Sequence, residues 1–166
     1  MIEFQYHKTA VAEFILGSFE NQLCLLDFRY RERRDAVDKR LKEGLKSKFV
    51  EGDNSLLRRV RRQIDEYLSG TRTQFDAPLL TVGSPFQKKV WQALLTVPYG
   101  QTSSYLALAR KIDNVKAVRA VAAANGANAI ALIIPCHRII GANGDLVGYA
   151  GGLPAKKRLL SIEQGQ

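Results

Sequence analysis

The sequence predicts an α+β fold with two lobes. A small N-terminal α/β lobe with a sheet led by a β-hairpin is expected over residues 1–83, and a mainly helical C-terminal lobe with a winged-helix-like helix-turn-helix over residues 84–166. The division depends on two observations: apolar and polar residues alternate near the N-terminus, and helical periodicity takes over from Ser84 onward. A chain of 166 residues is long enough for two small lobes that share an interface.

The composition limits the class of protein. Hydrophobic residues make up 46% of the chain, as in folded globular proteins. No apolar run is long enough to span a membrane, and "MIEFQYHKTA" lacks the order of a secretory signal. We therefore expect no membrane contact and a cytoplasmic location, with the nucleoid if the cell is prokaryotic.

Cysteine and histidine are scarce, with two of each in the chain. They show no paired spacing of the CxxC type, so the sequence predicts neither a disulfide framework nor a metal site. We expect no metal and no small-molecule cofactor.

Positive charge is concentrated in the second half of the chain. Residues 1–83 hold 15 Lys or Arg against 13 Asp or Glu, whereas residues 84–166 hold 10 against 3. A regional basic excess favours a polyanionic partner, with nucleic acid first and an acidic membrane surface second. A merely soluble basic surface is an equally ordinary explanation.

The N-terminal lobe is expected to begin with a hairpin. "AVAEFILGSF" and "QLCLLDF" alternate on either side of Glu20 and Asn21, and Cys24 is expected to be a small buried hydrophobe in the second strand. A helix over "RRDAVDKRLKEGL" and a short strand at "SKFV" follow.

A second helix in this lobe is predicted over "NSLLRRVRRQIDEYLSG", capped by Asp53 or Asn54 and ended by Gly70. Its four arginines are expected on a solvated face, because nearby acids balance their charge. "TRTQFDAPLLTVG" then forms a linker with a short extended piece.

Three helices are expected to follow Ser84. Ser84 and Pro85 have the residue types of a helix cap and first turn for "SPFQKKVWQALLTV". A helix "SYLALARKI" begins after Thr102 or Ser103, and a third, "VKAVRAVAAAN", follows a polar turn. Two short helices joined by a tight turn are typical of a DNA-docking helix-turn-helix, although tandem helices are also common without that function.

The third helix is rich in alanine. Val115, Val118 and Ala122 are expected to face the core, and a thin face is expected opposite them, which leaves Lys116 and Arg119 as the long side chains. A thin helix could approach a nucleic-acid groove closely and insert one arginine. Tight packing against another helix explains the alanines equally well. The thin face consists of Ala117, Ala120 and Ala124.

A nucleophile lies in the apolar segment "AIALIIPCHRII". Cys136 is followed by His137 and Arg138, and an imidazole or a guanidinium beside a thiol can lower its pKa. Adjacent side chains of a strand point to opposite faces, but Pro135 favours a turn here. In such a turn a water molecule would bridge the sulfur and the ring.

Glu163 is the carboxylate expected to orient His137. It lies on the face of the last helix that Leu159 and Leu160 are expected to bury, and a buried carboxylate needs a partner. A solvent-exposed Glu163 at the helix end is the alternative, and the spacing does not decide between them.

These motifs resemble the O6-alkylguanine-DNA alkyltransferases, a family also called methylated-DNA–protein-cysteine methyltransferases. "PYGQTSSY", "PCHR" and "GYAGG" occur in the family's order, and the resemblance covers essentially residues 84–163. The preceding hairpin-and-helix lobe is similar to the family's smaller N-terminal domain.

The resemblance implies that Cys136 accepts an alkyl group irreversibly from O6 of guanine, and also from O4 of thymine, in a reaction that each molecule performs once. His137 and Glu163 would form a water-linked proton relay. Asn128 would organise the active-site turn, and Tyr105 would hydrogen-bond the flipped base and assist its departure.

The resemblance further implies a DNA surface and a base pocket. Arg119 would fill the space of the extruded nucleotide. Some relatives carry serine at Ala150 and proline at Ala131, so contacts and room in the pocket would differ here. The other residues expected at the DNA are Lys116, Ala117, Ala120, Ser103 and Thr102, and those at the pocket are Tyr149, Gly151, Gly152 and Lys156.

The expected partner is double-stranded DNA containing O6-alkylguanine, bound by a monomer, with clustering on DNA as an open alternative. Two other functions remain to be weighed. A DNA-binding module without chemistry would not need the intact "PCHR", and a cysteine hydrolase would turn over repeatedly.

Overall fold

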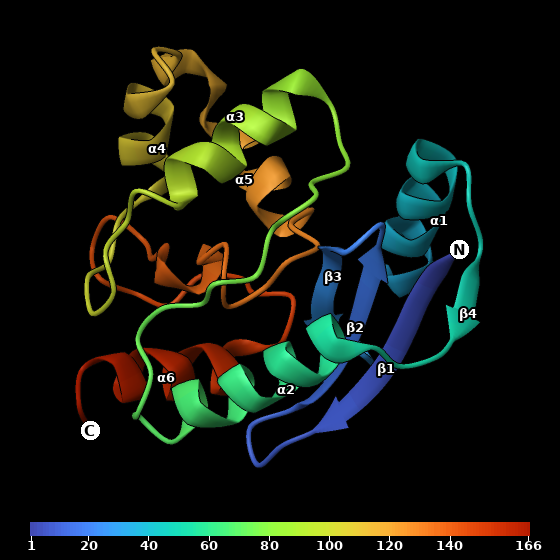
Figure 1. The fold of residues 1–166 in the computed structure, drawn as a ribbon. Coiled ribbons are helices and arrows are strands. Elements are labelled where there is room, and N and C mark those ends of the chain that lie inside the picture. The colour runs from blue at the N-terminus through green and yellow to red at the C-terminus, as the bar shows by residue number, and fades with distance from the viewer.

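A four-stranded sheet in the order β3-β2-β1-β4 forms the N-terminal part of the molecule (Figure 1). The structure is a computed structural model that describes residues 1–166. The predicted hairpin is confirmed, since β2 (Glu13–Phe19) and β3 (Gln22–Phe28) pair antiparallel around Glu20 and Asn21. Both turn residues have positive φ, which a tight hairpin turn of this type requires.

β1 (Ile2–Lys8) has no counterpart among the predicted elements. It pairs antiparallel with β2 and parallel with the short β4 (Phe49–Glu51), which matches the predicted strand near "SKFV". Ile2, Phe4 and Tyr6 alternate with polar residues, so the period-two signal is present in the sequence.

Two helices complete the N-terminal part, as predicted. α1 (Arg34–Leu45) buries Val37 and Leu41. α2 (Ser55–Leu68) packs against β1, β2 and β3, and the Asn54 side chain caps it by accepting a hydrogen bond from the Leu57 amide at 2.9 Å. Three of the four arginines of α2, Arg58, Arg59 and Arg61, pair with acids, which confirms a balanced face.

The C-terminal part is helical, as predicted. α3 begins with a capping box in which Ser84 and Gln87 satisfy each other's backbone amides. α6 runs beside α2 in Figure 1, so the last helix returns to the N-terminal part of the chain. The elements are α3 (Pro85–Leu94), α4 (Tyr105–Lys111), the 3₁₀ helix η1 (Val115–Ala117), α5 (Val118–Gly126), the 3₁₀ helix η2 (Cys136–Arg138) and α6 (Leu153–Glu163).

The expected inner face of the third C-terminal helix is only partly correct. Val118 packs against the core and Ala122 is half-buried, but Val115 lies outside the core, and Ala124 of the expected thin face is buried. Val115 is 53% exposed, whereas Val121, Ala124 and Asn125 are the buried residues of α5. The reason is that residues 115–117 form a 3₁₀ turn, which has three residues per turn and shifts the side chains out of phase with α5. The preceding helix also starts later than expected, because Ser104 is its cap and not its first residue.

One hydrophobic core joins both parts of the chain. The larger cluster of buried residues combines Leu26 of β3 with Trp91 of α3 and Leu159 of α6. Main-chain hydrogen bonds add to this contact, because the amide of Leu26 donates to Ala129 at 2.8 Å and its carbonyl accepts from Ala131. The segment that precedes the cysteine is thus docked on the edge of the sheet.

None of the helices combines the length and hydrophobicity that crossing a bilayer demands.

Candidate active site

The cysteine lies in a turn that one asparagine organises. The Asn128 amide nitrogen donates to the carbonyls of Ile134 at 2.9 Å and Ile130 at 3.3 Å, and its oxygen accepts from the Ile130 amide at 2.9 Å. These bonds tie the two ends of the segment 130–134 together just before Pro135 and η2. The expectation that a turn, and not a strand, presents Cys136 is therefore confirmed.

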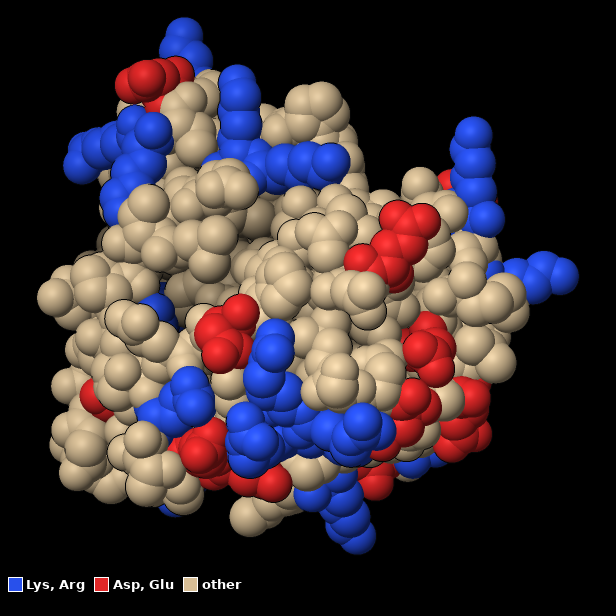
Figure 2. Space-filling model, viewed as in Figure 1, with Lys and Arg blue, Asp and Glu red and all other residues tan.

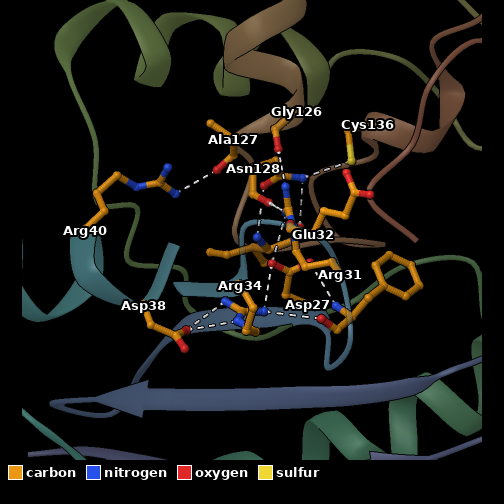
Figure 3. Close-up of polar contacts among 12 residues, drawn as sticks. Asp27, Arg31, Glu32, Arg34, Asp38, Arg40, Gly126, Ala127, Asn128 and Cys136 are labelled. Atoms are coloured by element: carbon orange, nitrogen blue, oxygen red, sulfur yellow. Dashed lines mark hydrogen bonds and ion pairs between the residues drawn. The ribbon is translucent and has the colours of Figure 1, made fainter. Parts of the chain in front are cut away.

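Cys136 is held at the base of a small cavity. The residue is only 5% exposed, and its sulfur lies 3.3 Å from the Asn128 amide nitrogen (Figure 3). The cavity has a volume of about 270 Å³, near the lower end of the range for ligand pockets, which is roughly 300–1,000 Å³. Its size suits one planar ring system.

The environment of the thiol differs from the expectation. Burial raises the pKa of Cys136 to about 11, although the hydrogen bond from Asn128 acts in the opposite direction. The sequence predicts a lowered pKa from the neighbouring imidazole and guanidinium, but both side chains are directed to Glu163 and neither donates to the sulfur. The resting cysteine is therefore a neutral thiol.

Glu163 is buried and lies at the centre of a polar cluster. It is 6% exposed, so the solvent-exposed alternative is wrong. Its carboxylate accepts from His137 Nε2 at 2.7 Å, from Arg138 Nε and Nη2 at 2.8 and 2.9 Å, and from the hydroxyl of Tyr67. Burial alone would raise the pKa of Glu163, but the bonds from His137 and Arg138 outweigh burial and hold this pKa at about 2.

The histidine is oriented by this cluster. Because Glu163 is a carboxylate, Nε2 of His137 carries the proton and Nδ1 is the free base. Nδ1 is buried and makes no hydrogen bond to the protein. Burial lowers the pKa of His137, against the opposing effect of Glu163, so the ring is neutral near pH 7 and able to take a proton at Nδ1.

The walls of the cavity come from both parts of the chain. Tyr105, Ala131, Tyr149 and Ala150 line it, as expected for residues of a base pocket. Burial raises the pKa of Tyr105, so its hydroxyl is a proton donor at neutral pH. The N-terminal part contributes Asp27, Phe28 and Arg31, which the sequence did not suggest.

Three other expected pocket residues lie beside the cavity and not on its wall. Gly151 and Gly152 line a neighbouring groove, where the Gly151 backbone packs on the ring of Phe28 and Gly152 precedes α6 with φ of 88°. Lys156 is fully buried, and its ammonium donates to the carbonyls of Ile139 and, at 2.8 Å, Val147. It holds together the two loops that border the site.

The residues expected at the DNA occupy a different surface. Arg119, Lys116 and Ala120 are exposed on η1 and α5, and Ala117 is half-buried. Thr102 is exposed, but the Ser103 main chain pairs with Arg138 and Ile140 and so connects the start of α4 to the cysteine turn. Figure 2 shows basic side chains with few acids over the α3 and α4 end, whereas those over α2 are mixed with acids.

Tyr67 belongs to the polar cluster around Glu163, although no sequence pattern indicates it. It lies in α2, is fully buried, and reaches both Glu163 and, at 3.3 Å, His137 Nε2. Its spacing of three residues from Ile64 places it on the inner face of α2, but that pattern cannot distinguish a core aromatic from a hydrogen-bond donor.

Comparison with known proteins agrees with this arrangement. Residues 85–165 match the model described as "6-O-methylguanine DNA methyltransferase, DNA binding domain", and residues 2–81 match that family's "ribonuclease-like domain". A methylated-DNA–protein-cysteine methyltransferase of Methanosarcina mazei is 42% identical over 96% of each chain.

Solved structures show the same fold over nearly the whole chain. The Mycobacterium tuberculosis O6-methylguanine methyltransferase has a TM-score of 0.83 at 34% identity, covering 99% of this chain and 94% of that one. The same organism's protein in complex with DNA has a TM-score of 0.82 at 36% identity, over 98% and 93% of the two chains. The two family models, the relatives and the shared fold together show that this chain belongs to the 6-O-methylguanine DNA methyltransferase family.

Proposed function

We propose that this protein repairs O6-alkylguanine in double-stranded DNA by transferring the alkyl group to Cys136. The observation that carries the proposal is the buried thiol at the base of a cavity of about 270 Å³, with Asn128 on one side and Tyr105 and Tyr149 on its walls. The names of the relatives support the same reaction. O4-alkylthymine is the second substrate that a cavity of this size would admit.

The transfer is a displacement at carbon. The Cys136 sulfur attacks the alkyl carbon, a carbon–sulfur bond forms, and the bond between that carbon and O6 breaks with its electron pair left on the guanine. The product is a thioether, and no group in the cavity is suited to cleave it. Each molecule therefore acts once.

A proton must leave the sulfur for this attack, since the resting pKa of about 11 that burial imposes keeps the thiol neutral. We assign the acceptor role to Nδ1 of His137, through one bridging water molecule. Glu163, fixed by Arg138 and Tyr67, stabilises the imidazolium that forms. Positioned proton transfer of this kind contributes typically 10²–10⁴-fold in rate.

The guanine must leave as a neutral base, because its anion is a poor leaving group. The Tyr105 hydroxyl lies on the cavity wall and would donate to the ring as the bond to O6 breaks. Burial raises its pKa, so the hydroxyl is protonated before the reaction. The proton that His137 takes from the thiol would then be relayed to the Tyr105 oxygen, so that the thiol and the alkylguanine become a thioether and neutral guanine.

The alkylated oxygen is out of reach inside a stacked duplex, so the nucleotide must be extruded into the cavity. Arg119 is exposed on α5 and would occupy the space that the nucleotide leaves, while Lys116, Ala117, Ala120, Thr102 and Ser103 would border the duplex.

We further propose a division of roles along the chain. Residues 84–166 form the DNA-binding and acceptor unit, and residues 1–83 support it. A monomer acts on each lesion, in the cytoplasm or nucleoid.

A transfer assay tests the proposal. The protein is incubated with a duplex carrying radiolabelled O6-methylguanine, and the label is located by peptide mass analysis. We expect one equivalent of label on the peptide containing Cys136 and none released to solution. Label that stays on the DNA would instead support a pure DNA-binding module, and product formed far beyond one equivalent would support a hydrolase.

A further inference from the structure

Arginines from the N-terminal part of the chain cap the end of α5. Arg31 Nη2 donates to the carbonyl of Gly126 at 2.8 Å, and its Nη1 lies 3.5 Å from the carbonyl of Asn128. Arg40 Nη2 donates to the carbonyl between them, that of Ala127, at 2.7 Å (Figure 3). The last carbonyls of a helix have no partner within it, and cations are favoured there, so this contact satisfies groups that α5 leaves open.

Arg31 is itself fixed by a buried acid. Asp27, at the end of β3, is fully buried and accepts from Arg31 Nη1 at 3.1 Å and from the Phe28 amide at 2.8 Å. Arg31 Nε also donates to the carbonyl of Glu32 at 3.0 Å, and its side chain is only 7% exposed. A planar guanidinium held from both sides in this way has one available orientation.

The capped turn leads directly to the reactive sulfur. Asn128 is the residue whose carbonyl faces Arg31 and whose side-chain amide lies 3.3 Å from the Cys136 sulfur. The main-chain bonds of Leu26 fix the residues just after Asn128, but they leave the carbonyls of residues 126–128 to the two arginines. Two side chains, those of Arg31 and Asn128, therefore connect the sheet to the thiol.

We propose that Arg31, held by Asp27, is a positioning residue for the alkyl transfer: it fixes the Gly126–Asn128 turn and, through Asn128, the Cys136 sulfur. The inference rests on the proposed function and gives the N-terminal part of the chain a role in the chemistry. Arg31 lies on the cavity wall, yet its donor groups are occupied by the protein, so it acts through Asn128 and not on the base.

This role is separable from DNA docking. Arg119 lies in the first turn of α5 and Lys116 in η1 just before it, at the other end of a helix of nine residues that is roughly 13 Å long. Loss of Arg31 should loosen the end of the helix that carries the turn and leave the DNA-facing end in place. The transfer rate should change, whereas the affinity for undamaged duplex should not.

The test compares Arg31→Met with Arg33→Met. Arg33 is in the same segment and makes no side-chain hydrogen bond or ion pair, so its replacement removes the same charge without breaking the cap. Single-turnover rates are measured with a saturating O6-methylguanine duplex and with free O6-benzylguanine, and duplex affinity is measured by fluorescence anisotropy. Displacements of about 1 Å at a reacting group can cost 10²-fold in rate.

We expect Arg31→Met to slow both reactions at least tenfold, with less than a twofold change in duplex affinity, and Arg33→Met to match the unchanged protein. Arg31→Lys keeps one donor group but loses the planar guanidinium, so its transfer rates should lie between those of Arg31→Met and Arg33→Met. If Arg31→Met does not fold, Arg31→Lys is compared with Arg33→Met instead. Rates of Arg31→Met and Arg31→Lys equal to those of Arg33→Met would overturn the inference.

A double-mutant cycle with Asn128→Ala separates positioning from general destabilisation. If Arg31 acts through Asn128, the two losses will be less than multiplicative, because the second change removes a link that is already broken. Fully multiplicative losses would contradict the inference. If the unchanged protein transfers no alkyl group, the proposed function fails. The positioning role of Arg31 can then be tested by the rate of Cys136 alkylation with iodoacetamide, measured across pH. The Arg31 variants should change that rate and its pH profile, and Arg33→Met should not.

Discussion

His137 Nε2 lies 2.7 Å from Glu163 Oε2, in a cluster where both side chains are inaccessible to solvent. Arg138 and Tyr67 share the same carboxylate, so its charge is compensated before any reaction begins. The carboxylate therefore orients the ring and stabilises its protonated form, while the opposite nitrogen remains the base. This relationship determines how the protein should respond to pH.

The transfer rate should be nearly independent of pH in the unchanged protein and steeply dependent in His137→Ala. In the unchanged protein the proton moves from sulfur to imidazole and stays within the site, so no net proton exchange with solvent is needed. Without the imidazole the rate follows the thiolate population, and with burial raising the pKa of Cys136 to about 11, it should rise tenfold per pH unit between about pH 6 and pH 9. Single-turnover rates across that range check this; a tenfold slope in the unchanged protein would remove the relay.

Glu163→Gln should destabilise the protein at neutral pH and much less in acid. Burial opposes ionisation of Glu163, but the bonds from His137 and Arg138 lower its pKa from 4.5 to about 2 in the folded state. A carboxylate with a lowered folded pKa stabilises the fold above its unfolded pKa, and that contribution disappears as the pH falls from about 4.5 to 2. A lowering of the pKa from 4.5 to about 2 corresponds to a pH-dependent loss of roughly 3 kcal/mol.

Urea unfolding at about pH 7 and about pH 3 measures this difference. Asp145→Asn, at an exposed acid in a loop, is the control and should change stability little at either pH. An equal loss for Glu163→Gln at both values would show that the carboxylate is not stabilised by its partners.

Cys136→Ala should bind DNA and accept no alkyl group. The other cysteine, Cys24, is a poor substitute, because burial in the sheet raises its pKa to about 12 and its thiol is directed to the carbonyl of Gly17. Intact-protein mass spectrometry after incubation with alkylated duplex checks the prediction. A persistent mass increase in the variant would identify a second acceptor.

Arg119→Ala should slow repair of duplex about tenfold or more and leave the reaction with free O6-benzylguanine unchanged. The arginine is exposed on α5, away from the cavity wall, and filling the gap in the duplex is worth a few kcal/mol of unstacking energy. Arg158→Ala, which removes an exposed charge from α6, is the matched control. Equal losses on the two substrates would place Arg119 in the pocket chemistry instead.

Gly151→Ala should destabilise the protein by about 1–3 kcal/mol, the usual cost of overpacking. A Cβ at this position would lie 2.5 Å from ring atoms of Phe28, and the loop that carries Tyr149 and Ala150 would have to move. Gly148→Ala is the control, because a Cβ there has no neighbour within 4 Å. Thermal unfolding of the two variants measures the difference. Equal melting temperatures would show that the Phe28 ring can move aside without cost, and would contradict the prediction.

Local sequence signals were sufficient for much of the fold. The hairpin around Glu20 and Asn21, the caps at Asn54 and Ser84, and the helices that follow them depend on residues a few positions apart, so they can be recognised from the sequence. The same applies to the turn before Cys136, because proline restricts its own backbone and that of its neighbour. The sequence pattern does not reveal the 3₁₀ turn at residues 115–117, which puts Val115 out of line with the buried face of α5.

The sequence by itself determined the candidate thiol, the imidazole and guanidinium that follow it, and the basic half of the chain. It left open whether Glu163 is buried beside His137. Only the tertiary structure decided how these groups are tuned. It buries the thiol and so raises its pKa, and it directs Arg138 to Glu163 and away from the sulfur. It also brings Tyr67, Asp27 and Arg31 to a site 70 residues or more further along the chain. Burial and hydrogen bonding depend on which distant segments pack together, and no local pattern encodes that.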